Sequence, residues 1–526
     1  MADESGLPIP RDHVLMTLAG ALEEARKLPE ARSAYRRVRE EFPSSPYARE
    51  AEQRAEYLSG PAQPQVVARA LEAVAVLVDD LQPLARRGGE RLLVDCGMFQ
   101  GRRELRLRNW TEPPYDPRTV GALVLTHTHL DHIGRVPRLV KQGFRGRILC
   151  TPATRELAEV LLIDAAHLQE EDASYLNRKG LSRHKPALPL FDTADAEACL
   201  RQFETVPVGE PCEVSKVFSF RFRDAGHLLG AASVDLTIRE GAGTVRALFS
   251  GDVGRFDAVV ARDPELAPEA DYMVVESTYG NRAHATVPVL DQLEGVLKRT
   301  FARGGVLLIP AFAVGRAQQM LHLVDRLVSS GRMRAFPIHL DSPMAIDATR
   351  IYAQFPDAHR PDVRAIAGGS AFHSKWLTLH RTRDESERLN SVKGPAVIVS
   401  SSGMLSGGRI LHHCRVRLPH AENTLLITGY QAEGTLGRSL LEGAKLVRIH
   451  KQPVPVLAEV TELRGLSGHA DAREIVRWLG AVKRPPRRIF LTHGEEEAAV
   501  AMAAHITRAR GFATAVPEPD EVVDLP

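Results

Sequence analysis

Residues 121–134 constrain the fold more than any other stretch, because an apolar run there is followed at once by metal-binding side chains. Ala122–Leu125 has the pattern of a short strand buried in a parallel sheet. The side chains that can bind a metal lie within six residues: His127, His129, Asp131 and His132. Alternate positions of an extended loop face one side, so His127 and His129 should converge on one point, and the other two on a neighbouring point. Such ligands suit zinc, and paired metals suit hydrolysis, so we predict a metal centre; the alternative is a histidine-rich surface loop.

The length of 526 residues allows roughly two or three domains with substantial cores. With 44% hydrophobic and 25% charged residues, the composition is that of an ordinary globular protein. The net charge of +2 is too small to indicate a polyanionic partner. Binding of a nucleic acid must therefore be argued from local sites and not from the overall charge.

Cysteine usage and the chain start both predict a cytoplasmic protein. The five cysteines form no CxxC pair, so we expect reduced and mostly buried thiols. The first six residues include Asp3 and Glu4 and lack the basic start and apolar core of a signal peptide. Because no apolar run approaches about 18 residues, we expect no membrane span.

The N-terminal part, residues 11–58, is rich in helix-forming residues, and we predict helices at 12–28, 30–41 and 46–58. The spacing of Tyr35, Phe42-Pro43 and Tyr47 resembles one tetratricopeptide unit. Because a lone unit cannot bury its own face, it must pack on the main body, on a second copy as a homodimer, or on a partner protein. The alternative is a helical cap without a binding role. Residues 59–65 have the composition of a linker.

From about residue 66, apolar strands alternate with helices, which is typical of α/β proteins. Strands are predicted at Val74–Val78 and Arg91–Val94, with a loop containing Arg87-Gly88-Gly89 between them. Asp95, the 127–132 cluster, His227 and Asp252 each follow a predicted strand. Because α/β sheets present their chemistry at strand ends, these side chains should share one site.

A second α/β region follows, with predicted strands at 306–309, 337–340, 396–399 and 424–428. The loops after the last two are rich in small residues, whose backbone N–H groups and hydroxyls suit phosphate. The candidate substrate-binding residues are Ser401, Ser402, Gly403, Arg409, Gly437 and Arg438. The alternative is that these loops are tight turns between strands.

These motifs together resemble the metallo-β-lactamase superfamily, in its β-CASP branch of nucleic-acid-processing nucleases. The resemblance covers about residues 90–496, and its motifs occur in the family's order. The motifs of the superfamily are Asp95, His127-Thr-His129-Leu-Asp131-His132, His227 and Asp252. The three motifs peculiar to the β-CASP branch are matched by Glu276, His469 and His493.

The resemblance implies an α/β fold: an αββα metallo-β-lactamase sandwich with an inserted α/β β-CASP domain, here preceded by the α-helical, tetratricopeptide-like segment. The expected domains are a helical segment and linker at 1–65, the first part of the metallo-β-lactamase domain at 66–274, the β-CASP domain at 275–445, and the second part at 446–526. Residues 66–80 depart from the family, since they lack its Gly/Ser-rich segment.

The resemblance also implies two zinc ions per chain. His127, His129 and His227 would bind one ion, Asp131, His132 and His493 the other, and Asp252 would bridge them. Asp95 would hold the metal loop. Catalytic roles fall to Asp131, Glu276 and His469: a metal-bridging hydroxide attacks, and His469, oriented by Glu276, acts as the general acid.

The expected function is that of a zinc-dependent ribonuclease hydrolysing RNA phosphodiester bonds. In the family a histidine at the His493 motif accompanies RNA processing, whereas DNA-repair members usually carry valine. One alternative is a di-zinc hydrolase of a small ester, thioester or phosphodiester, although a small substrate needs no second domain over the cleft. Another is a catalytically silent scaffold recruited through residues 11–58.

Several other polar residues have more than one interpretation. Adjacent residues on a helix point apart, so we interpret His412 and His413 as structural. His284, eight residues after Glu276, is interpreted as structural or exposed, and the alternative is a contact with the cleft. The basic residues just after the metal loop are Arg135, Arg138 and Lys141. They form either a solvated helix face or a contact with substrate.

Overall fold

The computed structural model describes residues 15–16, 18–19, 28–43, 45, 47–48, 51, 75–78, 83–87, 89–100, 103–182, 184–241, 243–284, 287–366, 372, 374–432, 434–518 and 521–524. The chain forms two compact units, Met1–Glu72 and Ala73–Pro526.

The first unit contains helix α2 (Leu28–Glu41), which includes the predicted helix at 30–41. Among the described residues of this unit, one apolar cluster consists of Leu15, Ala19, Ala34, Tyr35, Val38 and Ala51. The helices predicted at 12–28 and 46–58 lie mostly outside the described residues, and the linker at 59–65 lies wholly outside them. The likeness to a tetratricopeptide unit therefore stays a prediction.

Among the described residues, the second unit begins with a seven-stranded sheet in the order β22-β1-β2-β3-β4-β5-β6. Its strands are β1 (Ala75–Val78), β2 (Leu84–Arg87), β3 (Glu90–Val94), β4 (Ala122–Val124), β5 (Arg147–Cys150), β6 (Phe203–Thr205) and β22 (Glu521–Asp524). Strands β3 to β6 are parallel. The loop predicted before residue 91 is wrong in part, because Leu84–Arg87 pairs antiparallel with β3.

A second sheet, again of seven described strands, has the order β21-β20-β11-β10-β9-β8-β7. Its strands are β7 (Pro211–Glu213), β8 (Phe218–Asp224), β9 (Ala232–Glu240), β10 (Gly243–Phe249), β11 (Tyr272–Glu276), β20 (Arg488–Thr492) and β21 (Thr514–Ala515). Phe218, Phe220 and Phe222 alternate along β8 and enter one core with Leu92 and Val124 of the first sheet. The two sheets therefore pack face to face.

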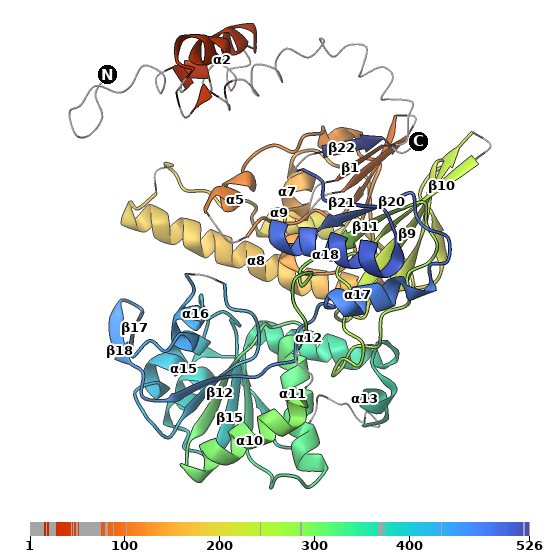
Figure 1. The fold of residues 1–526 in the computed structure, drawn as a ribbon. Coiled ribbons are helices and arrows are strands. Elements are labelled where there is room, and N and C mark those ends of the chain that lie inside the picture. Colours follow the sequence, from red (N-terminus) through yellow and green to blue (C-terminus); the bar gives the residue numbers. More distant parts are fainter. Residues whose placement is uncertain are drawn as a thin grey trace. The chain divides into compact units, whose positions relative to one another are not determined.

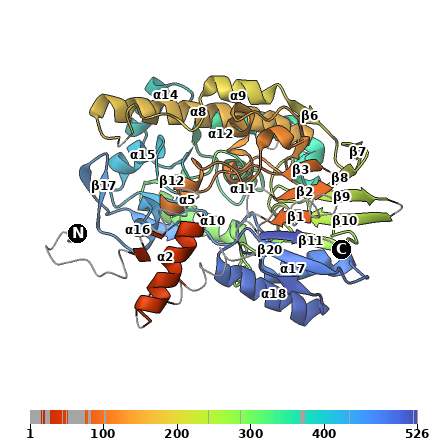
Figure 2. The ribbon, with the colours of Figure 1, turned by 90° about the horizontal axis from the view of Figure 1, so that it is seen from above.

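Helices cover the outer faces of both sheets, so the four layers of Figure 2 run helix, sheet, sheet, helix. Helices α7 (Val136–Lys141), α8 (Pro152–Lys179) and α9 (Thr193–Leu200) share a core with the first sheet. Helices α17 (Ala472–Trp478) and α18 (Glu496–Arg510) share one with the second. The expected αββα sandwich is confirmed.

The third sheet forms the lower body in Figure 1 and has six described strands, all parallel, in the order β14-β13-β15-β12-β16-β19. They are β12 (Val306–Pro310), β13 (Ile338–Asp341), β14 (Leu377–Leu379), β15 (Ala396–Ser400), β16 (Thr424–Ile427) and β19 (Glu459–Glu462). Strand β19 lies beyond residue 445, where the insert was expected to end, yet it pairs with β16. The sheet of the insert therefore includes a strand from the expected second part of the sandwich domain.

Both faces of the third sheet carry helices. Helices α10 (Val289–Ala302), α11 (Arg316–Ser329) and α12 (Pro343–Gln354) pack on one face, and α15 (Ile410–Arg417) and α16 (Leu436–Leu441) on the other. The remaining elements are short: α5 (Arg103–Arg108), α6 (Leu130–Ile133), α13 (Pro361–Ile366), α14 (Arg383–Arg388), β17 (Leu446–Ile449), β18 (Gln452–Pro455), and the 3₁₀ turns η1 (Pro117–Thr119), η2 (Pro356–Ala358), η3 (Leu389–Ser391) and η4 (Leu479–Ala481). An apolar cluster joins α8 to α12, and so joins the sandwich to the insert.

None of the five cysteines, all of them described, forms a disulfide, and four of them are buried, which agrees with the expected reduced and mostly buried thiols. None of the helices in the described part of the chain combines the length and apolarity needed to cross a membrane.

Candidate metal centre

The predicted site residues lie at the ends of neighbouring strands. Asp95 follows β3, His127 and His129 follow β4, and Asp252 follows β10. The remaining members come from later strands: Glu276 is the last residue of β11, and His493 follows β20. His227 lies in the loop between β8 and β9. Because the two sheets of the sandwich face each other, these residues from distant parts of the sequence meet at one edge.

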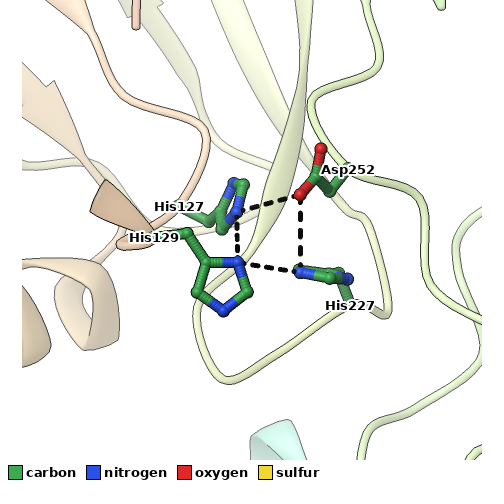
Figure 3. Close-up of side chains that lie close together, drawn as sticks. All are labelled: His127, His129, His227 and Asp252. Atoms are coloured by element: carbon green, nitrogen blue, oxygen red, sulfur yellow. Dashed lines mark hydrogen bonds and ion pairs between the residues drawn. The ribbon is translucent and has the colours of Figure 1, made fainter. Parts of the chain in front are cut away.

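A first group of donor atoms is formed by His127, His129, His227 and Asp252, whose side chains face one point in Figure 3. Nδ1 of His129 lies 3.1 Å from Nε2 of His127 and 3.2 Å from Nε2 of His227. Oδ2 of Asp252 lies 3.2 Å from Nε2 of His127 and 3.5 Å from Nε2 of His227. These four donor atoms lie close enough together to bind a single metal ion.

A second group consists of Asp131, His132 and His493. The Nε2 atoms of His132 and His493 are 3.2 Å apart, and Nε2 of His493 lies 3.6 Å from Oδ2 of Asp131. The other carboxylate oxygen of Asp252, Oδ1, lies 3.4 Å from Nε2 of His132 and 3.3 Å from Nδ1 of His493. Asp252 therefore faces both groups, with one oxygen towards each.

Both oxygens of Asp252 are buried and accept no hydrogen bond. A buried carboxylate without a donor is costly unless a cation compensates it. Ligands about 2.0–2.1 Å from a tetrahedral zinc ion lie about 3.3–3.4 Å from one another. The separations in both groups are close to this value, and the nitrogen and oxygen donors are those that zinc prefers. The residues present fit a metal cofactor.

The environment of the three histidines of the first group favours their neutral form, which is the form that binds a metal. Burial lowers the pKa of His127, and the neighbouring His132 lowers it further. Burial, with His127 as the next cause, lowers the pKa of His129 to about 3. Burial also holds the pKa of His227 well below its usual range. Neutral imidazoles have the free lone pair that metal binding requires.

In the second group, nearby carboxylates raise the pKa of both histidines. Burial lowers the pKa of His132, but the carboxylates of Asp252 and Asp95 outweigh it, so the pKa is raised well above the usual value. The pKa of His493 is raised to about 9, because Asp252 and Asp131 outweigh burial. The charge of Asp252 therefore favours the protonated form of both rings.

Asp95 lies behind the metal loop. Its Oδ1 accepts a hydrogen bond from the backbone N–H of Thr126 at 2.7 Å. Its Oδ2 lies 2.7 Å from the Thr126 hydroxyl and 2.7 Å from Nδ1 of His132. These contacts fix the ring of His132 so that Nε2 faces the donor group. Asp95 has a positive φ of 61°, an unfavourable backbone conformation for a residue with a side chain.

Replacing Asp95 by asparagine should weaken zinc binding about 10- to 100-fold, since the amide removes the charge and one acceptor that orient His132. The measurement is zinc competition against a chromophoric chelator. Asp116→Asn, at the start of η1, is the control and should leave zinc affinity unchanged. Equal affinity in Asp95→Asn and the native protein would contradict the supporting role.

His469 and Glu276 form a pair next to the donor groups. Nδ1 of His469 lies 3.2 Å from Oε2 of Glu276, a carboxylate that is almost fully buried. Oε1 of Glu276 accepts a hydrogen bond from the backbone N–H of Val253 at 2.7 Å, next to Asp252. Burial lowers the pKa of His469, but Glu276 and Asp252 outweigh it and raise the pKa above its usual value. His469 is thus held as a proton donor.

Some residues around the site were missed by the sequence analysis. Nδ1 of His227 bonds the carbonyl of Gly468 at 2.9 Å, and a Cβ at Gly468 would lie 2.9 Å from that ring. The hydroxyl of Thr278 lies 3.2 Å from Nδ1 of His493. His284, interpreted as structural or exposed, lies 2.9 Å from the carbonyl of His469 through Nε2. Closeness in sequence to Glu276 and His469 could have indicated Thr278 and Gly468, and the structure favours the alternative that His284 lies near the site.

The predicted phosphate loops lie after β15 and at the start of α16. The Ser401 hydroxyl donates to the Ser342 hydroxyl at 3.1 Å, and the Ser402 hydroxyl accepts from the Ser406 backbone N–H at 3.1 Å. Gly403 packs against Phe312, and Gly437 against Gln431. These loops are ordered by contacts within the protein.

The two predicted arginines of these loops have carboxylate partners. Arg409 binds the buried Asp341 at 2.8 Å and the carbonyls of His380 and Arg381. Arg438 is exposed and binds Glu442 at 2.6 Å. Arg409 therefore stabilises the loop, and the charge that it was expected to offer a substrate is already neutralised.

The other polar residues have separate environments. Nε2 of His413 lies 2.7 Å from Asp341, and His412 stacks on His450, which agrees with their structural interpretation.

The basic residues after the metal loop do not form one solvated face. Arg135 is buried, Arg138 donates to the Trp110 carbonyl at 2.9 Å, and Lys141 binds Asp195 at 2.6 Å.

Three family models match the chain in succession. The metallo-beta-lactamase superfamily matches residues 82–272, the Beta-Casp domain matches residues 317–440, and the Zn-dependent metallo-hydrolase RNA specificity domain matches residues 453–517. The matched segments contain the motif residues from His127 to Asp252 and both His469 and His493.

Individual proteins of similar sequence match most of the length of this chain. Ribonuclease TTHA0252 of Thermus thermophilus is 38% identical over 419 residues, which cover 79% of this chain and 90% of that protein. An RNase J-like protein of Methanocaldococcus jannaschii is 30% identical over 432 residues, covering 81% and 92%. Transcription termination factor FttA of Methanosarcina mazei is 30% identical over 435 residues, and the match covers 79% of this chain and 65% of that protein. The chain belongs to the metallo-β-lactamase superfamily, in its β-CASP branch, and is a metal-dependent hydrolase.

Proposed function

We propose that this protein is a zinc-dependent ribonuclease that hydrolyses phosphodiester bonds of RNA. The observation that carries the proposal is the His469–Glu276 pair beside the two donor groups that share Asp252. A proton donor next to a pair of metal sites suits cleavage of an ester with a poor leaving group, such as a ribose oxygen. The names of two similar proteins, a ribonuclease and an RNase J-like protein, support RNA as the substrate.

Two zinc ions per chain would fit the donor groups: His127, His129 and His227 for one, Asp131, His132 and His493 for the other, with Asp252 between them. When bound, the ions would supply activated water near neutral pH and positive charge against the phosphate. Asp95 holds His132 in the orientation that this arrangement requires.

Residues of the protein itself supply the proton that the departing oxygen needs. Nδ1–H of His469 donates to Glu276, which leaves Nε2–H to protonate the departing oxygen. The carboxylate of Glu276 orients the ring and favours its protonated form. Loss of the proton is opposed by the same charges that raise the pKa of His469.

We further propose that substrate phosphates contact the loops at Ser401, Ser402 and Gly403 and at Gly437. The backbone N–H groups and hydroxyls of these loops can donate hydrogen bonds to phosphate oxygens. Arg409 stabilises the first loop by binding Asp341.

The proposed domains are 1–65, 66–274, 275–445 and 446–526, with β19 extending the β-CASP sheet to residue 462. A partner protein or a homodimer formed through residues 11–58 is part of the same proposal.

One experiment tests the function. The purified protein is assayed for zinc per chain and given 5′-labelled single-stranded RNA and DNA of the same sequence. Two zinc ions per chain and cleavage of RNA in preference to DNA are expected. An Asp131→Ala sample, prepared in parallel, controls for contaminating nucleases. Two bound zinc ions with ready hydrolysis of small esters, but intact RNA, would overturn the ribonuclease proposal in favour of a small-molecule hydrolase.

A further inference from the structure

The carboxyl edge of the β-CASP sheet brings together segments that are far apart in the sequence. Strands β12, β15, β16 and β19 are parallel, so the residues that follow them emerge at the same edge. Gln431 Nε2, after β16, donates to the Gly403 carbonyl, after β15, at 3.0 Å. The segment after β19 leads from this edge to His469. The edge therefore adjoins the metal centre.

Two aromatic side chains stand exposed at this edge. Phe312 is 42% exposed and Tyr430 is 52% exposed, although both follow buried strands. Their backbones are held in place: the Phe312 carbonyl accepts from Ala317 N–H at 3.1 Å, and the Tyr430 carbonyl accepts from Gln431 Nε2 at 3.0 Å. Large rings that are exposed but fixed are suited to stacking, because little conformational entropy is lost when a partner binds.

Arg316, the first residue of α11, lies between these rings and the metal centre. Its Nη1 donates to Gln319 at 3.0 Å, while its Nε is buried and has no acceptor. Within the described part of the chain, no carboxylate lies within ion-pair distance of Arg316. Burial lowers its pKa to about 10, and the Tyr279 hydroxyl acts in the opposite direction. A half-buried guanidinium that has no acidic partner among the described residues favours an anion from outside the protein.

Tyr279 connects Arg316 to the catalytic groups. Its ring lies 6.0 Å from the ring of His469 and 5.1 Å from that of His284. On the other side, Nη2 of Arg316 lies 3.9 Å from the position that a Cβ on Gly429 would occupy, one residue before Tyr430. The order along the edge is therefore His469, Tyr279, Arg316 and Tyr430.

We propose that Phe312, Arg316 and Tyr430 form a binding subsite for single-stranded RNA beside the metal centre. Arg316 binds a backbone phosphate, and the two rings stack on unpaired bases. This inference rests on the proposed ribonuclease function and adds the substrate class to it. Bases in a duplex are already stacked, and every base has a face, so the subsite selects single strands and tolerates different sequences.

The test measures RNA binding and cleavage separately. Binding of a fluorescent single-stranded RNA is followed by anisotropy on zinc-loaded protein carrying His469→Ala, which slows cleavage. Phe312→Leu and Tyr430→Leu keep apolar volume but remove the ring, and each should weaken binding roughly tenfold. Arg316→Gln should weaken binding and make the slope of log affinity against log salt less negative by about 0.7, the loss of one phosphate contact.

The opposite edge of the same sheet offers matched controls. Trp376, 37% exposed, precedes β14, and Arg299 lies at the end of α10, before β12. Trp376→Leu and Arg299→Gln should leave RNA affinity within twofold. In the native background, Phe312→Leu and Tyr430→Leu should raise the KM for RNA, whereas Trp376→Leu and Arg299→Gln should leave it unchanged.

Unchanged single-strand affinity in all three subsite variants would overturn the inference, as would an equal loss of affinity for duplex and single-stranded RNA. These outcomes differ from a failure of the ribonuclease proposal. In that case native protein leaves RNA intact, whatever the subsite variants do to binding. Thermal unfolding midpoints close to that of the native protein would exclude misfolding as the cause.

Discussion

Asp252→Ala should abolish RNA hydrolysis and prevent stable loading of zinc. Asp252 is 1% exposed, and its two carboxylate oxygens face the two donor groups, at 3.2 and 3.5 Å on one side and 3.4 and 3.3 Å on the other. Loss of an outer partner of a metal ligand costs about 10- to 100-fold, so loss of a shared ligand should cost more. Zinc per chain, measured by mass spectrometry, should fall together with turnover.

The stability of the protein provides a second readout of the same change. A ligand that binds only the folded state at about 1,000 times its Kd adds about 4 kcal/mol to the free energy of unfolding. Zinc should therefore raise the midpoint of thermal unfolding of the native protein, and EDTA should reverse this. In Asp252→Ala the midpoint should no longer respond to zinc.

A control variant at a buried aspartate away from the site distinguishes loss of the metal from a general loss of stability. Asp235 on β9 is 6% exposed and is paired with Arg223 and Arg246. Asp235→Asn should lower stability but retain zinc and its effect on the unfolding midpoint. If Asp252→Ala kept its full zinc content and activity, the shared role of this carboxylate would be wrong.

Much of the site could be predicted from the sequence, because its residues follow short apolar runs. The run before His127 indicates a buried strand, and the same holds for Asp95 and Asp252. A parallel sheet brings such strand ends to one edge without any knowledge of the loops. The family resemblance implied only that Asp95 holds the metal loop, and the structure adds that it does so through contacts with Thr126 and His132.

Strand partners that are distant in sequence could not be predicted in the same way. Strand β19 has only four residues of mixed burial, and its local pattern does not indicate which sheet it joins. Its place beside β16 depends on the packing of the whole insert. For the same reason the pairing of β1 with β22, close to the end of the chain, was not expected.

The environments of individual side chains were even harder to predict from the sequence than the strand partners. Arg409 lies in a loop of small residues and has the pattern of a phosphate ligand, but its partner Asp341 lies 68 residues earlier. Phe312 lies among alanines and a valine, a pattern typical of a buried core, yet it is exposed. Whether an arginine is neutralised or an aromatic ring is covered depends on tertiary contacts, and these decide which residues can bind a substrate.

Glu276→Gln should move the alkaline limb of the pH–rate profile to lower pH. In the native protein the carboxylates raise the pKa of His469, so its acidic proton persists to higher pH and is lost as the pH rises through that raised value. The neutral amide removes the largest of the raising charges, so the proton is lost at a lower pH. An unchanged profile in a variant that still contains zinc would contradict the pairing.

His469→Ala should lower RNA turnover by about 100-fold or more while the zinc content stays intact. A general acid matters in proportion to the basicity of the leaving group. The ribose oxygen of RNA needs a proton, whereas p-nitrophenolate departs without one. The variant should therefore lose far more activity on RNA than on bis(p-nitrophenyl) phosphate. The control His284→Ala removes a contact to the His469 backbone but no proton donor to the substrate, and it should affect both substrates to a similar extent. Equal losses on both substrates in His469→Ala, or a loss of zinc, would instead make His469 a metal ligand or a structural residue, because only a proton donor distinguishes the two leaving groups.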